Sequence, residues 1–175
     1  MTASIAPLTV PKPDRPQMPK GYGVPEDEEG MLDWSYVREI METNMVYWVC
    51  SVRPNSRPHA SPIWGVWLDD RFFFEGSPET RRGRNISANP AVSVHTERGD
   101  EVVIIEGDVV AVEQPGPELG RRLSEAYAKY KDKYGYAPEP TAWDEQGIFA
   151  VTPRNVLAWK DFFKSATRWR FDRQA

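Results

Sequence analysis

Three arginines lie close together where a short helix is expected to begin: Arg81, Arg82 and Arg84. Ser77 is a favourable N-cap and Pro78 suits the first helical position, so both residues predict a helix start just ahead of the arginines. The free N–H groups at a helix start already make it partly positive, which disfavours unpaired cations. An anion, with phosphate as the usual candidate, would relieve this repulsion. A solvated basic face, partly neutralised by Glu79, is the alternative, and the local sequence leaves both interpretations open.

The charge of the whole chain limits the kind of anion. Lys and Arg number 22 and Asp and Glu number 26, which gives a formal net charge of −4. This balance lacks the basic footprint of a general nucleic-acid binder. Aromatic residues, 12% of the chain, would suit stacking on single-stranded nucleic acid, but the acidic charge and the localised arginines count against that function. We therefore expect a small anionic ligand and no nucleic-acid partner.

The length and the cysteine count bound the fold. A chain of 175 residues can bury about 70% of its unfolded surface, so it needs neither a disulfide nor a metal to fold. Cys50, the only cysteine, lies in an apolar run, which favours a buried thiol over a nucleophile. His59 and His95 are the only histidines, and no spacing of residues fits a zinc site. His59 is either a polar strand residue or a proton donor to a substrate.

The N-terminal part differs in composition from the rest of the chain. Residues 1–30 contain recurrent prolines and end in an acidic run, which predicts an extended or partly disordered arm. The arm either stays disordered or drapes over a neighbouring subunit. Residues 31–175 form the expected globular domain. No apolar segment approaches the length of a membrane span and the N-terminus lacks a signal-peptide core, so we expect a cytoplasmic protein with no membrane partner.

The domain has the pattern of hairpin-connected strands with a few helices. Strands are expected at about 45–52, 58–68, 71–75, 91–96, 101–113, 147–152, 156–159 and 167–171. Helices are expected at about 33–44, 78–89 and 117–134, the first with Trp34, Val37 and Met41 on its inner face. The steps between strands are too short for parallel crossovers, which excludes a doubly wound dinucleotide fold. The pattern predicts a mainly β fold, an antiparallel barrel with peripheral helices.

Four stretches of the chain carry a resemblance to a known family. They are Arg57–Trp64, Phe72–Ser77, Arg81–Pro90 and Glu101–Gly107. In this order and spacing, the chain resembles the pyridoxamine 5′-phosphate oxidase-like, FMN-binding split β-barrel family, and within it the actinobacterial flavin/deazaflavin oxidoreductases. The resemblance covers about residues 31–172. It implies a split β-barrel that works as a homodimer, with the cofactor pocket between the two subunits.

The resemblance also implies roles for individual residues. Arg82 stands where the family's phosphate-binding Lys or Arg lies, with Arg81 and Arg84 in support and Asn85 capping or orienting the group. The other implied cofactor contacts are Ser61, Pro62, Ile63 and Trp64 along the ring, Gly76 and Ser77 near the ribityl chain, and Trp159 and Arg170 closing the pocket from the partner subunit. The anion that the arginines require would then be the cofactor's phosphate.

The cofactor implied by the resemblance is the deazaflavin coenzyme F420, with FMN as the alternative. A cofactor of this kind performs the hard step, so no side-chain nucleophile is needed and no catalytic residue is assigned. The implied function is hydride transfer to a conjugated small molecule. An FMN-dependent oxidase or reductase and a non-catalytic flavin- or haem-binding protein remain as alternatives. Arg168, Trp169 and Arg170 replace the family's substrate-binding Arg-x-His, which argues against vitamin B6 oxidation.

A substrate would stack on the exposed face of the cofactor ring. Four aromatic residues of the expected strands are candidate walls for it: Tyr47, Trp64, Trp67 and Phe74. Aromatic strand residues lie in a core more often than in a pocket, and the sequence leaves both placements open.

Overall fold

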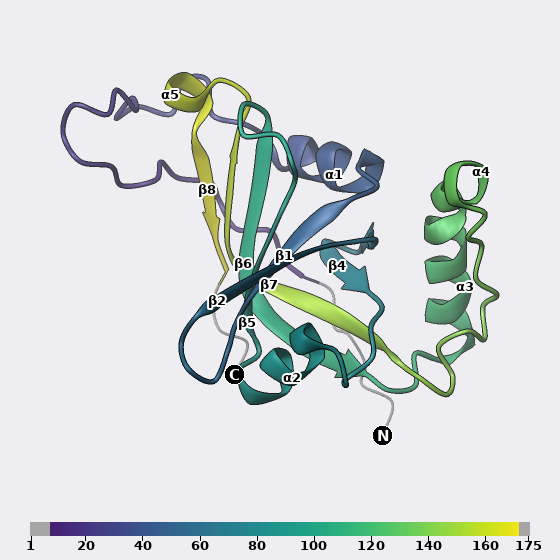
Figure 1. Ribbon diagram of the computed structural model, residues 1–175. Helices are drawn as coiled ribbons and strands as arrows, with labels where there is room; N and C mark the ends of the chain where they lie inside the picture. Colours follow the sequence, from purple (N-terminus) through teal and green to yellow (C-terminus); the bar gives the residue numbers. More distant parts are fainter. Residues whose placement is uncertain (1–7, 172–175) are drawn as a thin grey trace.

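One antiparallel sheet organises residues 8–171, the part of the chain that this computed structural model describes (Figure 1). Its strands are β1 (Tyr47–Val52), β2 (Pro58–Ile63), β3 (Val66–Leu68), β4 (Arg71–Phe74), β5 (Ala91–His95), β6 (Val102–Val112), β7 (Ile148–Trp159) and β8 (Thr167–Arg170). They lie in the order β2-β1-β5-β6-β7-β4-β3, and β8 pairs with β7. The sheet curls into a half-barrel, which confirms the predicted mainly β, split-barrel class.

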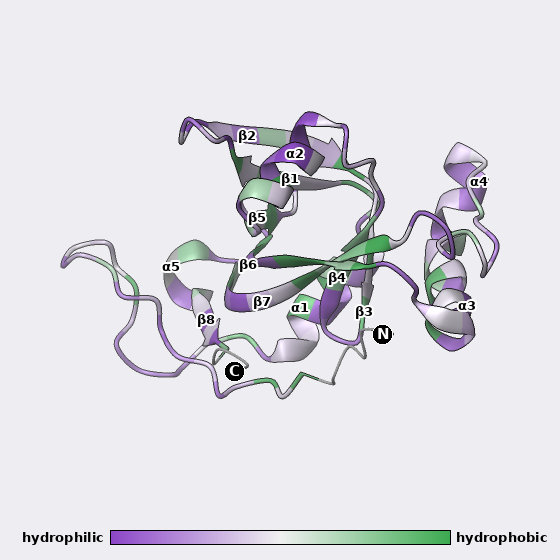
Figure 2. Ribbon diagram, turned by 90° about the horizontal axis from the view of Figure 1, so that it is seen from below, coloured by the Kyte–Doolittle hydropathy of each residue, from purple (hydrophilic) through white to green (hydrophobic). Residues whose placement is uncertain are grey.

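Short helices lie around the sheet. They are α1 (Trp34–Thr43), α2 (Arg81–Ala88), α3 (Gly116–Tyr127), the 3₁₀ turn η1 (Ala128–Tyr130), α4 (Lys131–Tyr134) and α5 (Phe162–Ser165). Figures 1 and 2 show α3 and α4 standing together beside one end of the sheet. The single helix predicted over about 117–134 is thus divided by η1. It ends at Gly135, whose left-handed φ of 66° gives a favourable helix stop.

The longest pairing joins β6 and β7, which run side by side over their whole length. The prediction of two strands at 147–152 and 156–159 was wrong, because β7 is continuous from Ile148 to Trp159. The ladder shifts register between Glu106 and Gly107, opposite Pro153. Proline lacks an N–H group, and it is tolerated in a strand at such an irregularity. Pro153 therefore marks a bulge here and not a strand end.

The strand predicted over about 58–68 is broken in two at Trp64 and Gly65, between β2 and β3. A side chain at position 65 would collide with the Phe72 ring, since a Cβ atom built there lies 2.3 Å from Phe72 Cζ. Glycine therefore lets the chain pass close over β4. The break leaves Trp64 38% exposed at the end of β2.

Two groups of buried side chains form the core. The larger lies between the sheet and α1, whose Trp34, Val37 and Met41 are buried as predicted. The smaller lies between α3–η1 and the strands β3 and β4, with Leu123, Tyr127 and Tyr130 at its centre. Figure 2 shows the hydrophobic stretch of β6 running through the middle of the fold. Three of the candidate substrate walls belong to the core, being 0 to 5% exposed: Tyr47, Trp67 and Phe74.

The described part of the proline-rich arm, residues 8–30, lies against its own chain. Asp14 exchanges two backbone hydrogen bonds of 2.8 Å with Arg168 of β8. Its carboxylate accepts hydrogen bonds from the guanidinium groups of Arg168 and Arg170, and the bond from Arg168 is the main cause of the lowered pKa of Asp14. Arg15 donates to backbone carbonyls in the arm and in the α5–β8 segment. These contacts fasten the arm to the last strand.

Across residues 8–171, none of the helices combines the length and apolar character needed to cross a lipid bilayer. The predicted cytoplasmic location stays a prediction.

We expect Gly107→Ala to destabilise the protein by about 1–3 kcal/mol, because a Cβ atom there would lie 2.3 Å from the Thr152 carbonyl oxygen across the bulge. Gly99→Ala is the matched control, since a Cβ atom at that position meets nothing within 4 Å. Urea denaturation followed by tryptophan fluorescence measures both. Equal stability of the two variants would mean that the close approach at the bulge is not a constraint.

Candidate functional site

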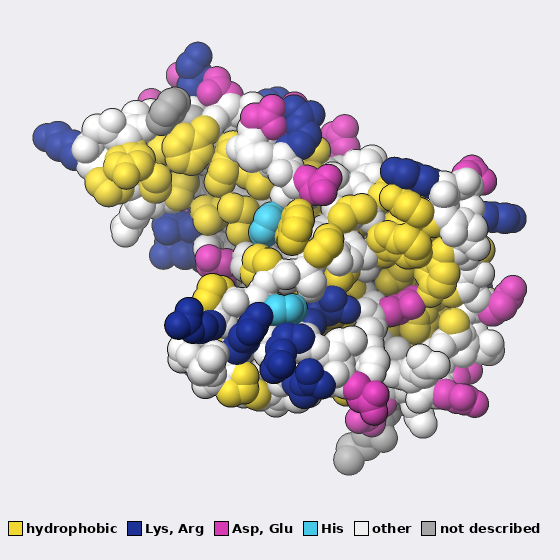
Figure 3. All heavy atoms as spheres, in the orientation of Figure 1, with side chains coloured by type: hydrophobic (Ala, Val, Ile, Leu, Met, Phe, Trp, Pro, Cys, Tyr) yellow, Lys and Arg dark blue, Asp and Glu magenta, His cyan; other side chains and the backbone are white. Residues whose placement is uncertain are grey.

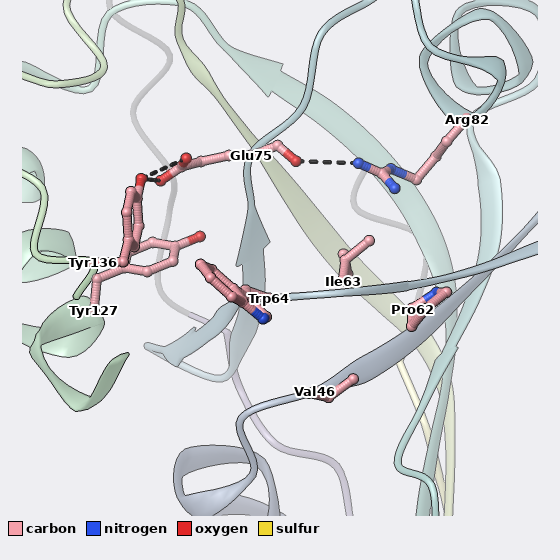
Figure 4. A pocket seen from close by; sticks show the side chains of 8 residues that line it. All are labelled: Val46, Pro62, Ile63, Trp64, Glu75, Arg82, Tyr127 and Tyr136. Atoms are coloured by element: carbon pink, nitrogen blue, oxygen red, sulfur yellow. Dashed lines mark hydrogen bonds between the residues drawn. The ribbon is translucent and has the colours of Figure 1, made fainter. Parts of the chain in front are cut away.

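A cavity of about 530 Å³ opens between the end of β2 and the segment that contains α3 and α4 (Figure 4). Its walls are formed by Val46, Pro62, Ile63, Trp64, Glu75, Arg82, Tyr127 and Tyr136. This volume falls within the range of about 300–1,000 Å³ that is usual for small-molecule sites. Three of the four residues predicted to lie along a cofactor ring, Pro62, Ile63 and Trp64, are thus on one wall.

Helix α2 brings Arg82 to the cavity. The prediction that Ser77 caps this helix was wrong, because Thr80 is the N-cap and its hydroxyl accepts a hydrogen bond from Gly83 N–H at 3.0 Å. The Ser77 hydroxyl instead accepts from Glu79 N–H at 3.1 Å, within a turn that precedes the helix. Local sequence favours either residue as a cap, and the extra turn decides between them. The shift places Arg81 and Arg82 in the first turn.

Arg82 is a half-buried cation at one end of the cavity. Its Nη1 donates to Ser61 Oγ at 3.1 Å, and its Nη2 donates to the Glu75 carbonyl at 3.3 Å. The guanidinium also lies over the Phe74 ring, 5.5 Å from its centre. Burial lowers the pKa of Arg82, and among residues 8–171 no carboxylate forms an ion pair with it. A desolvated cation held only by neutral acceptors is a strong site for an anion.

Gly76 leaves the room that this guanidinium occupies. A Cβ atom at position 76 would lie 2.7 Å from Arg82 Nη2, so a larger residue would push the side chain out of place. Ser77 follows directly, in the turn before α2. The structure therefore brings Gly76 and Ser61 next to Arg82, whereas Ser77 is not part of the cavity wall.

The other predicted partners of the anion do not line the cavity. Arg81 and Arg84 are exposed, and Arg84 donates to the Glu79 carbonyl of its own turn. Asn85 is fully buried, and its amide donates to Ser51 Oγ of β1 at 3.0 Å. Asn85 thus fastens α2 to β1 and is not part of the cavity wall. A polar side chain at this position could either bind the anion or pair with the sheet, and only the tertiary structure, which places Ser51 beside Asn85, decides between the two roles.

Trp159 and Arg170 lie away from the cavity of their own chain. The indole Nε1 of Trp159 donates to the Gly99 carbonyl at 2.8 Å, and its ring packs edge-on against Phe162. Arg170 pairs with Asp14 at 2.7 Å. His59 is not part of the cavity wall, and burial and then the nearby arginines lower its pKa.

The end of the cavity opposite Arg82 carries residues that the sequence interpretation did not select. Tyr136 donates its hydroxyl hydrogen to the Glu75 carboxylate, whose two oxygens lie 2.7 Å away, and Trp143 Nε1 donates to the same group at 3.1 Å. Burial and the hydrogen bond to Glu75 raise the pKa of Tyr136. Tyr127 completes this wall. In the sequence, Tyr127 falls at helical spacing with Leu119, Leu123 and Tyr130, an apolar stripe that indicates a core residue. Periodicity alone does not distinguish a core residue from one in a cavity wall.

Trp64 forms an aromatic shelf between the two ends. Its ring stacks on Tyr130 at a centroid distance of 5.4 Å and lies 4.5 Å from the ring of Tyr134. Tyr130 is fully buried and stabilises the segment between β2 and β3, beside Trp64. Its hydroxyl accepts a hydrogen bond from Gly65 N–H at 3.0 Å and lies 2.6 Å from the Gly65 carbonyl oxygen and 2.8 Å from the Met45 carbonyl oxygen. The buried Tyr130 hydroxyl therefore fixes the backbone next to Trp64 and so positions the Trp64 ring.

In residues 8–171 there is no cluster of three or more His, Cys, Asp or Glu side chains that could hold a metal ion.

An antiparallel half-barrel of this kind is the fold of the flavin-type split-barrel oxidoreductases. The family model of pyridoxamine 5′-phosphate oxidase matches residues 35–160, and the chain belongs to this family. Among curated protein sequences, none matches this chain.

Solved structures share the fold at low sequence identity. An F420 reductase is 23% identical, with 68% of this chain and 94% of that chain covered and a TM-score of 0.52. A FAD-binding protein from Mesorhizobium loti is 18% identical, with 79% and 95% covered and a TM-score of 0.55. A conserved hypothetical protein from Mycobacterium tuberculosis is 14% identical, with 82% and 88% covered and a TM-score of 0.58. At these identities the likeness concerns the fold alone.

We expect Tyr130→Phe to destabilise the protein by about 1–3 kcal/mol, because it leaves buried backbone groups of Gly65 and Met45 without their partner. Tyr134→Phe is the control: that ring also touches Trp64 but is 36% exposed, so the change should stay within about 0.5 kcal/mol. Thermal and urea unfolding measure the difference. A Tyr130→Phe protein as stable as the wild type would show that this hydroxyl does not stabilise the segment between β2 and β3.

Proposed function

We propose that this protein is a homodimeric oxidoreductase that uses the deazaflavin coenzyme F420, or alternatively FMN, to transfer a hydride to a conjugated small-molecule acceptor. The observation that carries the proposal is Arg82, a half-buried cation without a carboxylate partner in the described chain, at one end of an aromatic cavity. A cofactor phosphate supplies the missing negative charge. The likeness to the F420 reductase fold supports the choice of cofactor.

The residues of the cavity fit such a cofactor. Arg82 would hold its phosphate, steadied by Ser61 and by the Glu75 carbonyl. The strand segment Pro62–Trp64 would support the flat ring, which matches the apolar and aromatic character of that wall. When bound, the cofactor supplies the hydride chemistry, and the protein binds it, orients it and excludes water. Arg81 and Arg84 would contribute long-range attraction from the exposed side of α2.

The homodimer is supported by an apolar row across the outward face of the sheet. Pro62, Trp48, His95, Ile104 and Leu157 lie next to one another on neighbouring strands. Hydrophobic side chains gather over the centre of this view of the molecule, above a cluster of Lys and Arg (Figure 3). Pro62 is exposed and the other four side chains are partly exposed, and a mostly apolar surface of this kind is a candidate interaction site. Pro62 belongs both to the row and to the cavity wall, so a second subunit on this face would border the cavity.

We expect Arg82→Ala to weaken coenzyme F420 binding roughly 10- to 100-fold, because a charge-assisted phosphate contact is lost. Fluorescence titration of the purified protein with coenzyme F420 and with FMN measures this and also separates the two cofactors. Arg81→Ala is the matched control, since Arg81 neighbours Arg82 but does not line the cavity. Unchanged affinity of Arg82→Ala for both cofactors would remove the basis of the assignment.

A panel of conjugated acceptors distinguishes an enzyme from a carrier. The proposal expects oxidation of the bound, reduced cofactor by at least some enones or quinones. Tight cofactor binding with no oxidation by any acceptor would favour a non-catalytic flavin-binding protein.

We expect Leu157→Asp to convert the dimer to a monomer, because it places a charge at the β7 end of the apolar row. Light scattering coupled to size-exclusion chromatography gives the mass of each form. Ala128→Asp, an exposed position on η1, is the control and should leave the mass unchanged. A wild-type protein that elutes as a monomer at all concentrations contradicts the homodimer.

A further inference from the structure

The hydroxyl of Tyr127 is a buried polar group without a partner in the described chain. Tyr127 is 1% exposed, lines the cavity, and its oxygen makes no hydrogen bond to any of residues 8–171. The hydroxyls of the other fully buried tyrosines have hydrogen-bond partners. Tyr47 bonds to the Met41 and Asn44 carbonyls, and Tyr130 bonds to the Met45 and Gly65 carbonyls. An unpaired buried hydroxyl is unfavourable in the free protein, so it is expected to have a function that requires it.

The ring that carries this hydroxyl is held on several sides. It contacts Tyr130 and Trp143, each at a centroid distance of 5.7 Å, and Tyr136 edge-on at 5.9 Å. Figure 4 shows the Tyr127 hydroxyl directed into the cavity, toward Trp64. The packing prevents the ring from turning away, so the O–H group is oriented before any ligand arrives. Preorganised donors of this kind stabilise charge that develops on a ligand without reorganisation.

The charges around the cavity indicate which ligand suits this donor. The Glu75 carboxylate, held by Tyr136 and Trp143, lies at the same end as Tyr127, whereas Arg82 lies at the opposite end (Figure 4). An anionic group would be repelled by Glu75 and attracted by Arg82. Burial and the nearby Glu75 raise the pKa of Tyr127 well above its usual value, so the hydroxyl stays protonated and acts as a donor. The Tyr127 end therefore favours a neutral ligand that accepts a hydrogen bond.

We propose that Tyr127 hydrogen-bonds to the carbonyl oxygen of a neutral, α,β-unsaturated ketone while that acceptor is reduced. This inference rests on the proposed function and assigns the substrate end of its site. The hydride from the reduced coenzyme forms a C–H bond at the β carbon, and the coenzyme is oxidised. The electron pair of the C=C bond takes a proton from water at the α carbon as the hydride adds, so that no full negative charge develops beside Glu75, and hydroxide is left to the solvent. The Tyr127 O–H group holds and polarises the carbonyl oxygen and keeps its own proton.

The test is Tyr127→Phe, which removes the oxygen and keeps the ring that packs on Tyr130, Trp143 and Tyr136. With cyclohexenone as the acceptor and reduced coenzyme F420 bound, we expect kcat/KM to fall roughly 100-fold, as is usual when one such donor is removed. Coenzyme affinity should not change, because Arg82 and Pro62–Trp64 are untouched. The melting temperature should stay within about 2 °C of the wild type or rise, because the hydroxyl has no partner to lose.

The controls separate this role from a structural one. Tyr134→Phe, at an exposed position of the same segment, should change neither rate nor stability. Tyr130→Phe, in contrast, should lower the melting temperature. A Tyr127→Phe protein with unchanged kcat/KM, or with a clearly lowered melting temperature, overturns the inference. If the wild type binds the coenzyme but does not reduce cyclohexenone, the inference is wrong while the cofactor assignment stands; if it does not bind the coenzyme, both are wrong.

Discussion

The burial of one guanidinium group beside an aromatic cavity is the constraint on which the site depends. Arg82 of α2 donates to Ser61 on β2 and to the Glu75 carbonyl after β4, so it joins three elements of the fold. Neutral oxygens only partly compensate a desolvated cation. The arrangement therefore favours an anion beside Arg82, and the cofactor phosphate of the proposed function would be that anion.

The cavity has two chemically different ends. The Arg82 end offers a cation, and the other end offers the Tyr127 and Tyr136 hydroxyls and the Glu75 carboxylate, with the Trp64 shelf between them. Glu75 contributes to both ends, since its carbonyl accepts from Arg82 and its side chain accepts from Tyr136. A small displacement of this one residue would change both. The polar groups are thus positioned by the β4–α2 connection and not independently.

Aromatic packing provides the rigidity that such a site needs. Tyr127 lines the cavity from α3, outside the sheet, and is held by Trp143, while Tyr130 of η1 supports Trp64 and is not itself part of the cavity wall. The hydroxyl of Tyr130 replaces regular ladder bonds where β2 ends and β3 begins. A polar network of this kind specifies one arrangement of the chain because each misplacement leaves a buried group unpaired. The break in the sheet therefore forms part of the site.

The sequence by itself determined the fold class, most of the element order, and the identity of Arg82, Pro62, Ile63 and Trp64 as cavity residues, because turn signals, strand periodicity and family motifs are local. It did not reveal that β7 continues through Pro153, that Thr80 caps α2, or that the Asn85 side chain is buried against Ser51 of β1. These depend on what each segment meets across the fold. Tyr127 illustrates the difference: its apolar spacing indicates burial, but only the tertiary structure decides that its buried hydroxyl faces a cavity and has no partner there.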